Sequence, residues 1–132
     1  MKITIETIPH AKQRYPSCGD WYFDGDGTLQ IKVSEEIGTK SAGLVAIHEL
    51  CEVFLCSEGL TLPKVALDAL VDEVDKFDKE YTGNLVDEEP GDDPMAPYNR
   101  QHSIATAVER ILCADLGLPW KVHDDAVAAL FE

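Results

Sequence analysis

The fold is decided by one stretch, Ser41-Ala-Gly-Leu-Val-Ala-Ile-His48-Glu49-Leu-Cys-Glu52-Val-Phe-Leu-Cys56. It is almost wholly apolar, and only His48, Glu49 and Glu52 add acidic or basic side chains. Its length and composition predict a buried helix over about residues 39–57. At about 100° per residue, His48 and Glu52 lie one above the other, with Glu49 about a quarter-turn away. The helix therefore presents one narrow polar arc, which must face water or a bound metal ion.

Alternating polar and apolar residues upstream of this helix predict a small sheet, with strands at residues 2–8, 21–23 and 29–33. Between the last two strands, Asp24-Gly-Asp-Gly27 favours a tight hairpin. Downstream, helical spacing of apolar residues predicts three further helices, at residues 61–81, 99–116 and 119–131. We therefore expect an α+β fold in which a three-stranded antiparallel sheet precedes about four helices.

The chain is predicted to form a single domain, because 132 residues with 45% hydrophobic content can bury one ordinary core. The sheet is expected within residues 1–34 and the helices within residues 39–132. An acidic loop with three prolines, at residues 82–98, interrupts the helical part. Loops of this length in compact domains are usually functional or disordered.

Composition disfavours several classes of partner. The formal net charge of −14 argues against direct nucleic-acid binding and against anionic membrane surfaces, because phosphate contacts need clustered lysine and arginine. No run approaches the roughly 20 apolar residues that span a bilayer, and the amino terminus lacks a signal-peptide pattern, so we expect a cytoplasmic protein. The four cysteines lack both metal-ribbon spacing and disulfide-scaffold density, which favours buried thiols.

The polar arc has the form His-Glu-x-x-Glu, from His48 to Glu52. In zinc hydrolases with His-Glu-x-x-His on a helix, the first and last side chains bind zinc and the internal glutamate is the general base. Here Glu52 replaces the second histidine, and a carboxylate oxygen is an ordinary zinc ligand. The motif therefore predicts His48 and Glu52 as ligands and Glu49 as the catalytic base.

Such a site needs a third ligand, and a histidine would restore the familiar set of two histidines and one glutamate. His102 and Glu109 share one arc of the helix predicted at residues 99–116. If that helix packs beside the first one, either side chain could reach the metal. We assign His102 as the ligand and Glu109 as a supporting group or alternative ligand. His10 and His123 are expected to be surface histidines, because His10 follows a strand-ending proline and His123 lies in a polar stretch beside Asp124 and Asp125.

Three segments carry a resemblance: Thr7-Ile-Pro-His-Ala-Lys-Gln-Arg-Tyr15, His48-Glu-Leu-Cys-Glu52 and Pro90-Gly-Asp-Asp-Pro-Met-Ala-Pro-Tyr98-Asn-Arg-Gln-His102. Together they resemble a group of short uncharacterised proteins of phages and prophages. More remotely, strands followed by a His-Glu helix are similar to the minimal zincin core. The chain departs from the zincin pattern at Glu52 and in its distant histidine. The resemblance implies a phage-type protein and supplies no activity of its own.

Three functions fit the sequence. The first is a zinc-dependent, metallopeptidase-like hydrolase that acts on an unidentified small molecule or peptide. The second is a non-catalytic acidic protein that binds a basic surface of a partner protein. The third is a magnesium-dependent nucleotide pyrophosphohydrolase, in which Glu49 and Glu52 pair with Asp72 and Asp75.

Overall fold

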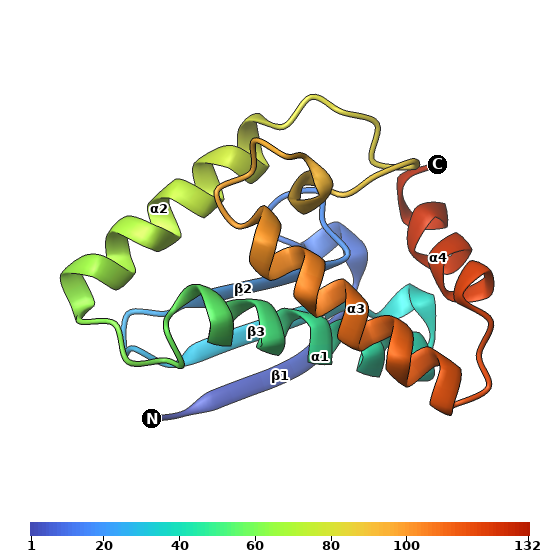
Figure 1. Cartoon of the computed structure of the whole chain (residues 1–132), viewed down its shortest axis with the longest axis horizontal. Helices are drawn as coiled ribbons and strands as arrows, with labels where there is room; N and C mark the ends of the chain where they lie inside the picture. Colours follow the sequence, from blue (N-terminus) through green and yellow to red (C-terminus); the bar gives the residue numbers. More distant parts are fainter.

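The computed structural model describes all 132 residues, and its strands precede its helices along the chain (Figure 1). The strands are β1 (Ile3–Ile8), β2 (Gly19–Phe23) and β3 (Leu29–Ser34). The helices are α1 (Thr39–Cys56), α2 (Lys64–Glu80), α3 (Asn99–Asp115) and α4 (Trp120–Ala128). The predicted α+β fold, with a three-stranded sheet followed by four helices, is therefore confirmed.

The sheet is mixed, so the prediction of a fully antiparallel sheet is wrong for one strand pair. The strand order is β1-β3-β2, with β2 antiparallel and β1 parallel to β3. The Asp24–Gly27 turn joins β2 and β3 as the expected hairpin, and Asp24 accepts hydrogen bonds from the backbone amides of Asp26 and Thr28. β3 occupies the centre because its inward side chains, Leu29, Ile31 and Val33, are fully buried.

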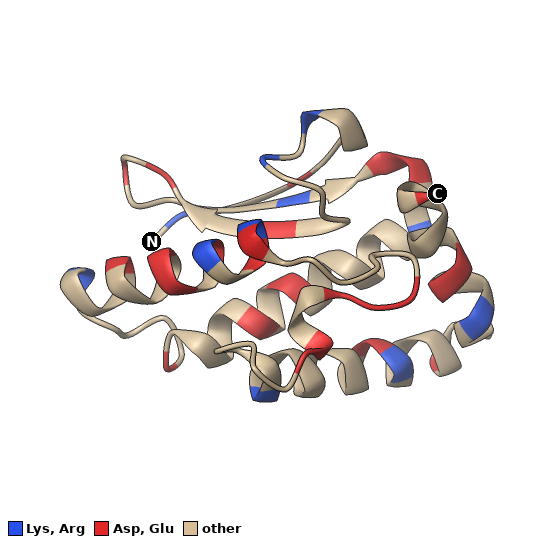
Figure 2. Cartoon of the chain, turned by 90° about the horizontal axis from the view of Figure 1, so that it is seen from above, with Lys and Arg blue, Asp and Glu red and all other residues tan.

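Helix α1 is the middle layer of the molecule. One of its sides packs on β2 and β3, and another packs against α3 (Figure 2). Val45 and Val53 join Ile31 and Trp21 in the hydrophobic core on the sheet side. Because α3 covers the neighbouring side, the polar arc of α1 faces protein rather than open solvent.

The acidic loop between α2 and α3 is folded over the start of α3. It contains a short 3₁₀ turn at Pro90–Asp92, and Asn99 donates a hydrogen bond to the carbonyl oxygen of Gly91. A Cβ atom built on Gly91 would lie 2.4 Å from Cγ of His102, so only glycine allows this approach. No helix combines the length and the apolar character needed to cross a membrane.

Candidate metal centre

The structure brings three of the predicted site residues to one point. His48 and Glu52 come from α1, and His102 comes from the first turn of α3. Nε2 of His48 lies 3.3 Å from Oε2 of Glu52 and 3.2 Å from Nδ1 of His102. The remaining side of this triangle, between Nδ1 of His102 and Oε2 of Glu52, measures 3.0 Å. All three residues are at least nine-tenths buried.

The spacing of these atoms suits a small tetrahedral ion. Ligands about 2.0–2.1 Å from zinc in tetrahedral geometry are roughly 3.3–3.4 Å apart. The three observed separations, 3.0–3.3 Å, are close to that value. Two imidazole nitrogens and one carboxylate oxygen also form a donor set that zinc accepts, with a fourth position left for water. His48, Glu52 and His102 could therefore hold a metal ion with little rearrangement.

His48 is oriented by a second buried chain of polar groups. Its Nδ1 donates to Oε1 of Glu109 at 2.8 Å. The other carboxylate oxygen of Glu109 accepts a hydrogen bond from Nε2 of His123, and Nδ1 of His123 lies 2.9 Å from Oγ of Ser41. A carboxylate on the far nitrogen of a metal-binding histidine fixes the ring and its tautomer. Glu109 is thus placed as a supporting group for His48.

Glu52 and His102 are held in the same way. The indole Nε1 of Trp21 donates to Oε1 of Glu52 at 2.9 Å, which leaves Oε2 for the shared point. Nε2 of His102 donates to Oδ1 of Asp92 at 3.0 Å, and Oε2 of Glu89 lies 3.2 Å from the same nitrogen. Each of the three candidate ligands therefore keeps one atom at the centre while its other polar atom is anchored.

The electrostatics of the cluster favour positive charge. Burial by itself lowers the pKa of His48, but hydrogen bonds to Glu109 and Glu52 outweigh burial and raise that pKa well above its usual value. Burial likewise raises the pKa of Glu52, but the two histidines more than offset it and the pKa is lowered. The same buried carboxylates that stabilise protonated histidines would stabilise a bound cation.

Glu49 lies beside this centre without a bonding partner. It exposes 9% of its surface, and no side chain of the protein donates a hydrogen bond to it. Burial raises the pKa of Glu49 well above its usual value, and the nearby carboxylate of Glu52 raises it further. Its carboxylate packs against Gly19, where an added Cβ would lie 2.6 Å from Oε1. An unpaired buried carboxylate of this kind is suited to proton transfer.

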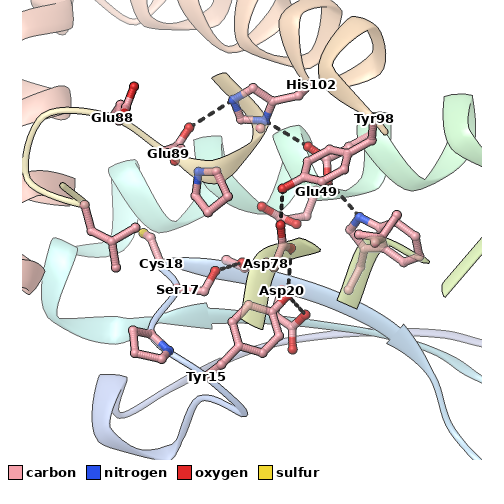
Figure 3. A pocket seen from close by; sticks show the side chains of 18 of the residues that line it. Tyr15, Ser17, Cys18, Asp20, Glu49, Asp78, Glu88, Glu89, Tyr98 and His102 are labelled. Atoms are coloured by element: carbon pink, nitrogen blue, oxygen red, sulfur yellow. Dashed lines mark hydrogen bonds and ion pairs between the residues drawn. The ribbon is translucent and has the colours of Figure 1, made fainter. Parts of the chain in front are cut away.

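A cavity of about 50 Å³ adjoins the cluster, and Glu49, Glu52 and His102 are in its wall (Figure 3). One water needs roughly 10–15 Å³ of such space, so the cavity admits several waters or the end of a side chain. The wall also contains Asp78, which accepts hydrogen bonds from the hydroxyls of Tyr15 and Tyr98. The cavity therefore gives small groups access to the candidate centre.

The sequence predicts that His10 and His123 are surface histidines, and the structure places the two residues differently. His10 is half-buried and hydrogen-bonded to Ser34, outside the cluster. The prediction that His123 is a surface histidine is wrong, because it exposes only 1% of its surface and bonds to Glu109. Its spacing from Trp120 and Val127 on α4 places it on the inward face of the helix, and that periodicity was the available signal.

The carboxylate pairs of the magnesium hypothesis are not brought together. Asp75 is ion-paired with Arg14 at 3.2 Å, and Asp72 is exposed on α2. Glu52 instead belongs to the cluster with His48 and His102, and Glu49 lies beside that cluster. The four cysteines carry free thiols, and three of them are buried.

No known protein family, curated protein or solved structure matches this chain.

Glu109→Gln is expected to lower the affinity for zinc by about 10- to 100-fold, the usual cost of losing an outer hydrogen-bonding partner of a metal-binding histidine. A neutral amide cannot accept from both His48 and His123 with the strength of a carboxylate. Competition against a chromophoric chelator measures the change. Glu73→Gln removes the same charge from the exposed face of α2 and should bind zinc as the unmodified chain does. Equal affinities of the two variants would contradict the supporting role of Glu109.

The buried Asp78 predicts a pH dependence of stability. Burial raises the pKa of Asp78 to about 7, although hydrogen bonds from Tyr98 and Tyr15 oppose the shift. Between the unfolded-state pKa of about 3.9 and this value, the folded chain binds more protons than the unfolded chain, so stability falls as pH rises. In metal-free protein, the free energy of unfolding should therefore decrease relative to Asp78→Asn from about pH 4 to about pH 7. Urea unfolding of both chains measures this, and a constant difference would contradict it.

Proposed function

We propose that this protein is a zinc-dependent hydrolase in which His48, Glu52 and His102 hold the metal. The observation that carries the proposal is the convergence of Nε2 of His48, Oε2 of Glu52 and Nδ1 of His102 within 3.0–3.3 Å of one another. Support comes from the anchored far atoms of all three side chains and from the adjoining cavity. The reaction class is hydrolysis of an amide bond, as in a metallopeptidase.

Each residue has a stated role. Zinc held by His48, Glu52 and His102 would supply an activated water at neutral pH. Glu49 would accept a proton from the attacking water at its carboxylate and would return that proton to the leaving amine. Trp21, Asp92 and Glu109 keep the three ligands oriented. Because Glu49 has no internal partner, its carboxylate is free for this transfer.

The proposal is tested by metal removal and return. Hydrolysis of a mixed peptide library, followed by mass spectrometry, is expected to stop after chelation and to recover after addition of about one equivalent of zinc. Recovery with zinc and loss with chelator support the proposal. Hydrolysis that persists after complete removal of the metal would contradict it.

A second candidate function rests on charge. Acidic side chains lie along α2 and the acidic loop, and the formal net charge is −14 (Figure 2). Such a surface favours a basic partner protein through fast, salt-sensitive association. In that case the protein would be folded and would bind its partner without metal, which the same chelation experiment separates from the first proposal.

A further inference from the structure

The cavity beside the candidate centre is lined by carboxylates and by no lysine or arginine. Six acidic side chains belong to its wall: Asp20, Glu49, Glu52, Asp78, Glu88 and Glu89. Several are already neutralised within the fold. Asp20 is paired with Arg14 at 2.7 Å, and Glu52 is bonded to two histidines and to Trp21.

Three wall carboxylates have no cationic partner inside the chain, and one of them, Asp78, accepts hydrogen bonds only from tyrosine hydroxyls. Glu49 is nine-tenths buried, unbonded and directed at the cavity (Figure 3). Glu88 is exposed on the acidic loop and is also one of the residues that line the cavity. Burial disfavours the charged form of a carboxylate that has no partner, and a positive group placed in the cavity would stabilise that charged form. A negative ligand would be repelled by these carboxylates.

The same cavity also has an apolar portion. Pro16, Leu85 and Phe131 contribute to its wall. Long cationic side chains bury an aliphatic stem along apolar surface while the charged head meets polar partners. The wall therefore suits an alkyl stem that ends in a positive charge, and its volume of about 50 Å³ suits only the end of such a group.

We propose that this cavity binds an alkylammonium or alkylguanidinium group, so that the substrate is an amide carrying positive charge close to the bond that is cleaved. The substrate class rests on the proposed hydrolase function, whereas binding of the cation does not. The positive group is supplied by a basic side chain or by a free amino terminus. Glu88 is a specificity-determining residue in this arrangement, and the net negative surface steers the cation toward the cavity.

The first experiment measures binding without catalysis. The probe is 1-butylguanidinium, which keeps its charge at neutral pH and has no lone pair to give a metal, and butylurea is its neutral isostere. Amide NMR shifts of Gly19 and Leu85, both in the cavity wall, report occupancy in metal-free and zinc-loaded protein. The guanidinium is expected to bind at least about tenfold more tightly than the urea. Equal binding of the two probes would overturn the proposal.

Two variants test whether Glu88 contributes to the selective binding of butylguanidinium. Glu88→Gln is expected to weaken butylguanidinium binding by about two- to fivefold, in the range for an exposed charge pair, and to leave butylurea unchanged. Glu73→Gln, which removes the same charge away from the cavity, should leave both probes unchanged. Equal weakening by the two variants would show a general effect of net charge and would overturn the role of Glu88.

A second arm uses zinc-loaded enzyme and matched peptides. Acetylated peptides with arginine or its neutral isostere citrulline test a basic side chain, and citrulline peptides with a free or acetylated amino terminus test the terminal amine. The charged member of one pair is expected to have at least about a tenfold higher kcat/KM. Equal hydrolysis within both pairs refutes the positively charged substrate class but does not contradict the hydrolase function. Selective butylguanidinium binding without any hydrolysis upholds the cation site and refutes the hydrolase.

Discussion

Protein purified without added metal and without affinity histidines is expected to carry about one zinc per chain, and Glu52→Gln and His102→Ala are expected to carry none. Glutamine can still accept the hydrogen bond of Trp21, so Glu52→Gln removes the anionic ligand while the indole keeps its partner. Loss of a direct ligand should lower zinc affinity by more than about a hundredfold, the upper limit for an outer hydrogen-bonding partner. Elemental analysis of the purified chains measures the zinc.

His10→Ala is the matched control for this measurement. His10 lies outside the cluster, hydrogen-bonded to Ser34, so its removal should leave the zinc content unchanged. Circular dichroism checks that each variant is folded. A folded wild-type chain that takes up no zinc would contradict the metal centre and favour the acidic binding protein.

Glu49→Gln is expected to retain zinc and to lose hydrolysis by about 10²–10⁴-fold, which is the usual contribution of a general base. The reason is geometric, because Glu49 lines the cavity beside Glu52 and His102 but is not part of the ligand triangle. The measurement pairs zinc content with the rate of peptide hydrolysis on the same preparation. A variant that loses metal and activity together would place Glu49 among the ligands instead.

The control for this second experiment is Glu73→Gln, which should keep both zinc and activity because its side chain is exposed on α2. Unchanged hydrolysis by Glu49→Gln would remove Glu49 from the mechanism. In that event Asp78 is the other carboxylate of the cavity wall that could exchange protons, since its pKa is raised to about 7 by burial.

Much of the candidate site could be predicted because it depends on helical periodicity. The four-residue spacing of His48 and Glu52 puts both side chains on one face whatever the fold around them. His102 and Glu109 are seven residues apart and share a face for the same reason. The contact between these two faces depends on tertiary packing, because α1 lies between the sheet and α3.

The remaining features depend on long-range packing, which local patterns do not specify. The ten residues between β1 and β2 could have closed a hairpin, but β3, whose inward side chains are fully buried, takes the central position and β1 runs parallel to it. The burial of His123 is a second example. The neighbouring aspartates suggest a surface position, but the helical spacing places His123 on the inward face of α4. Its partner Glu109 lies on another helix, and no local pattern connects them.

The hydrogen bond between Trp21 and Glu52 has a spectroscopic consequence. Indole emission depends on the charge near the ring nitrogen, and here that charge belongs to a candidate ligand. The second tryptophan, Trp120, lies on α4 under the guanidinium of Arg110 and makes no contact with the ligand triangle. The fluorescence of Trp21 is therefore expected to change when the candidate centre is occupied. In a Trp120→Phe variant, Trp21 would be the only tryptophan and its emission alone would report occupancy of the site.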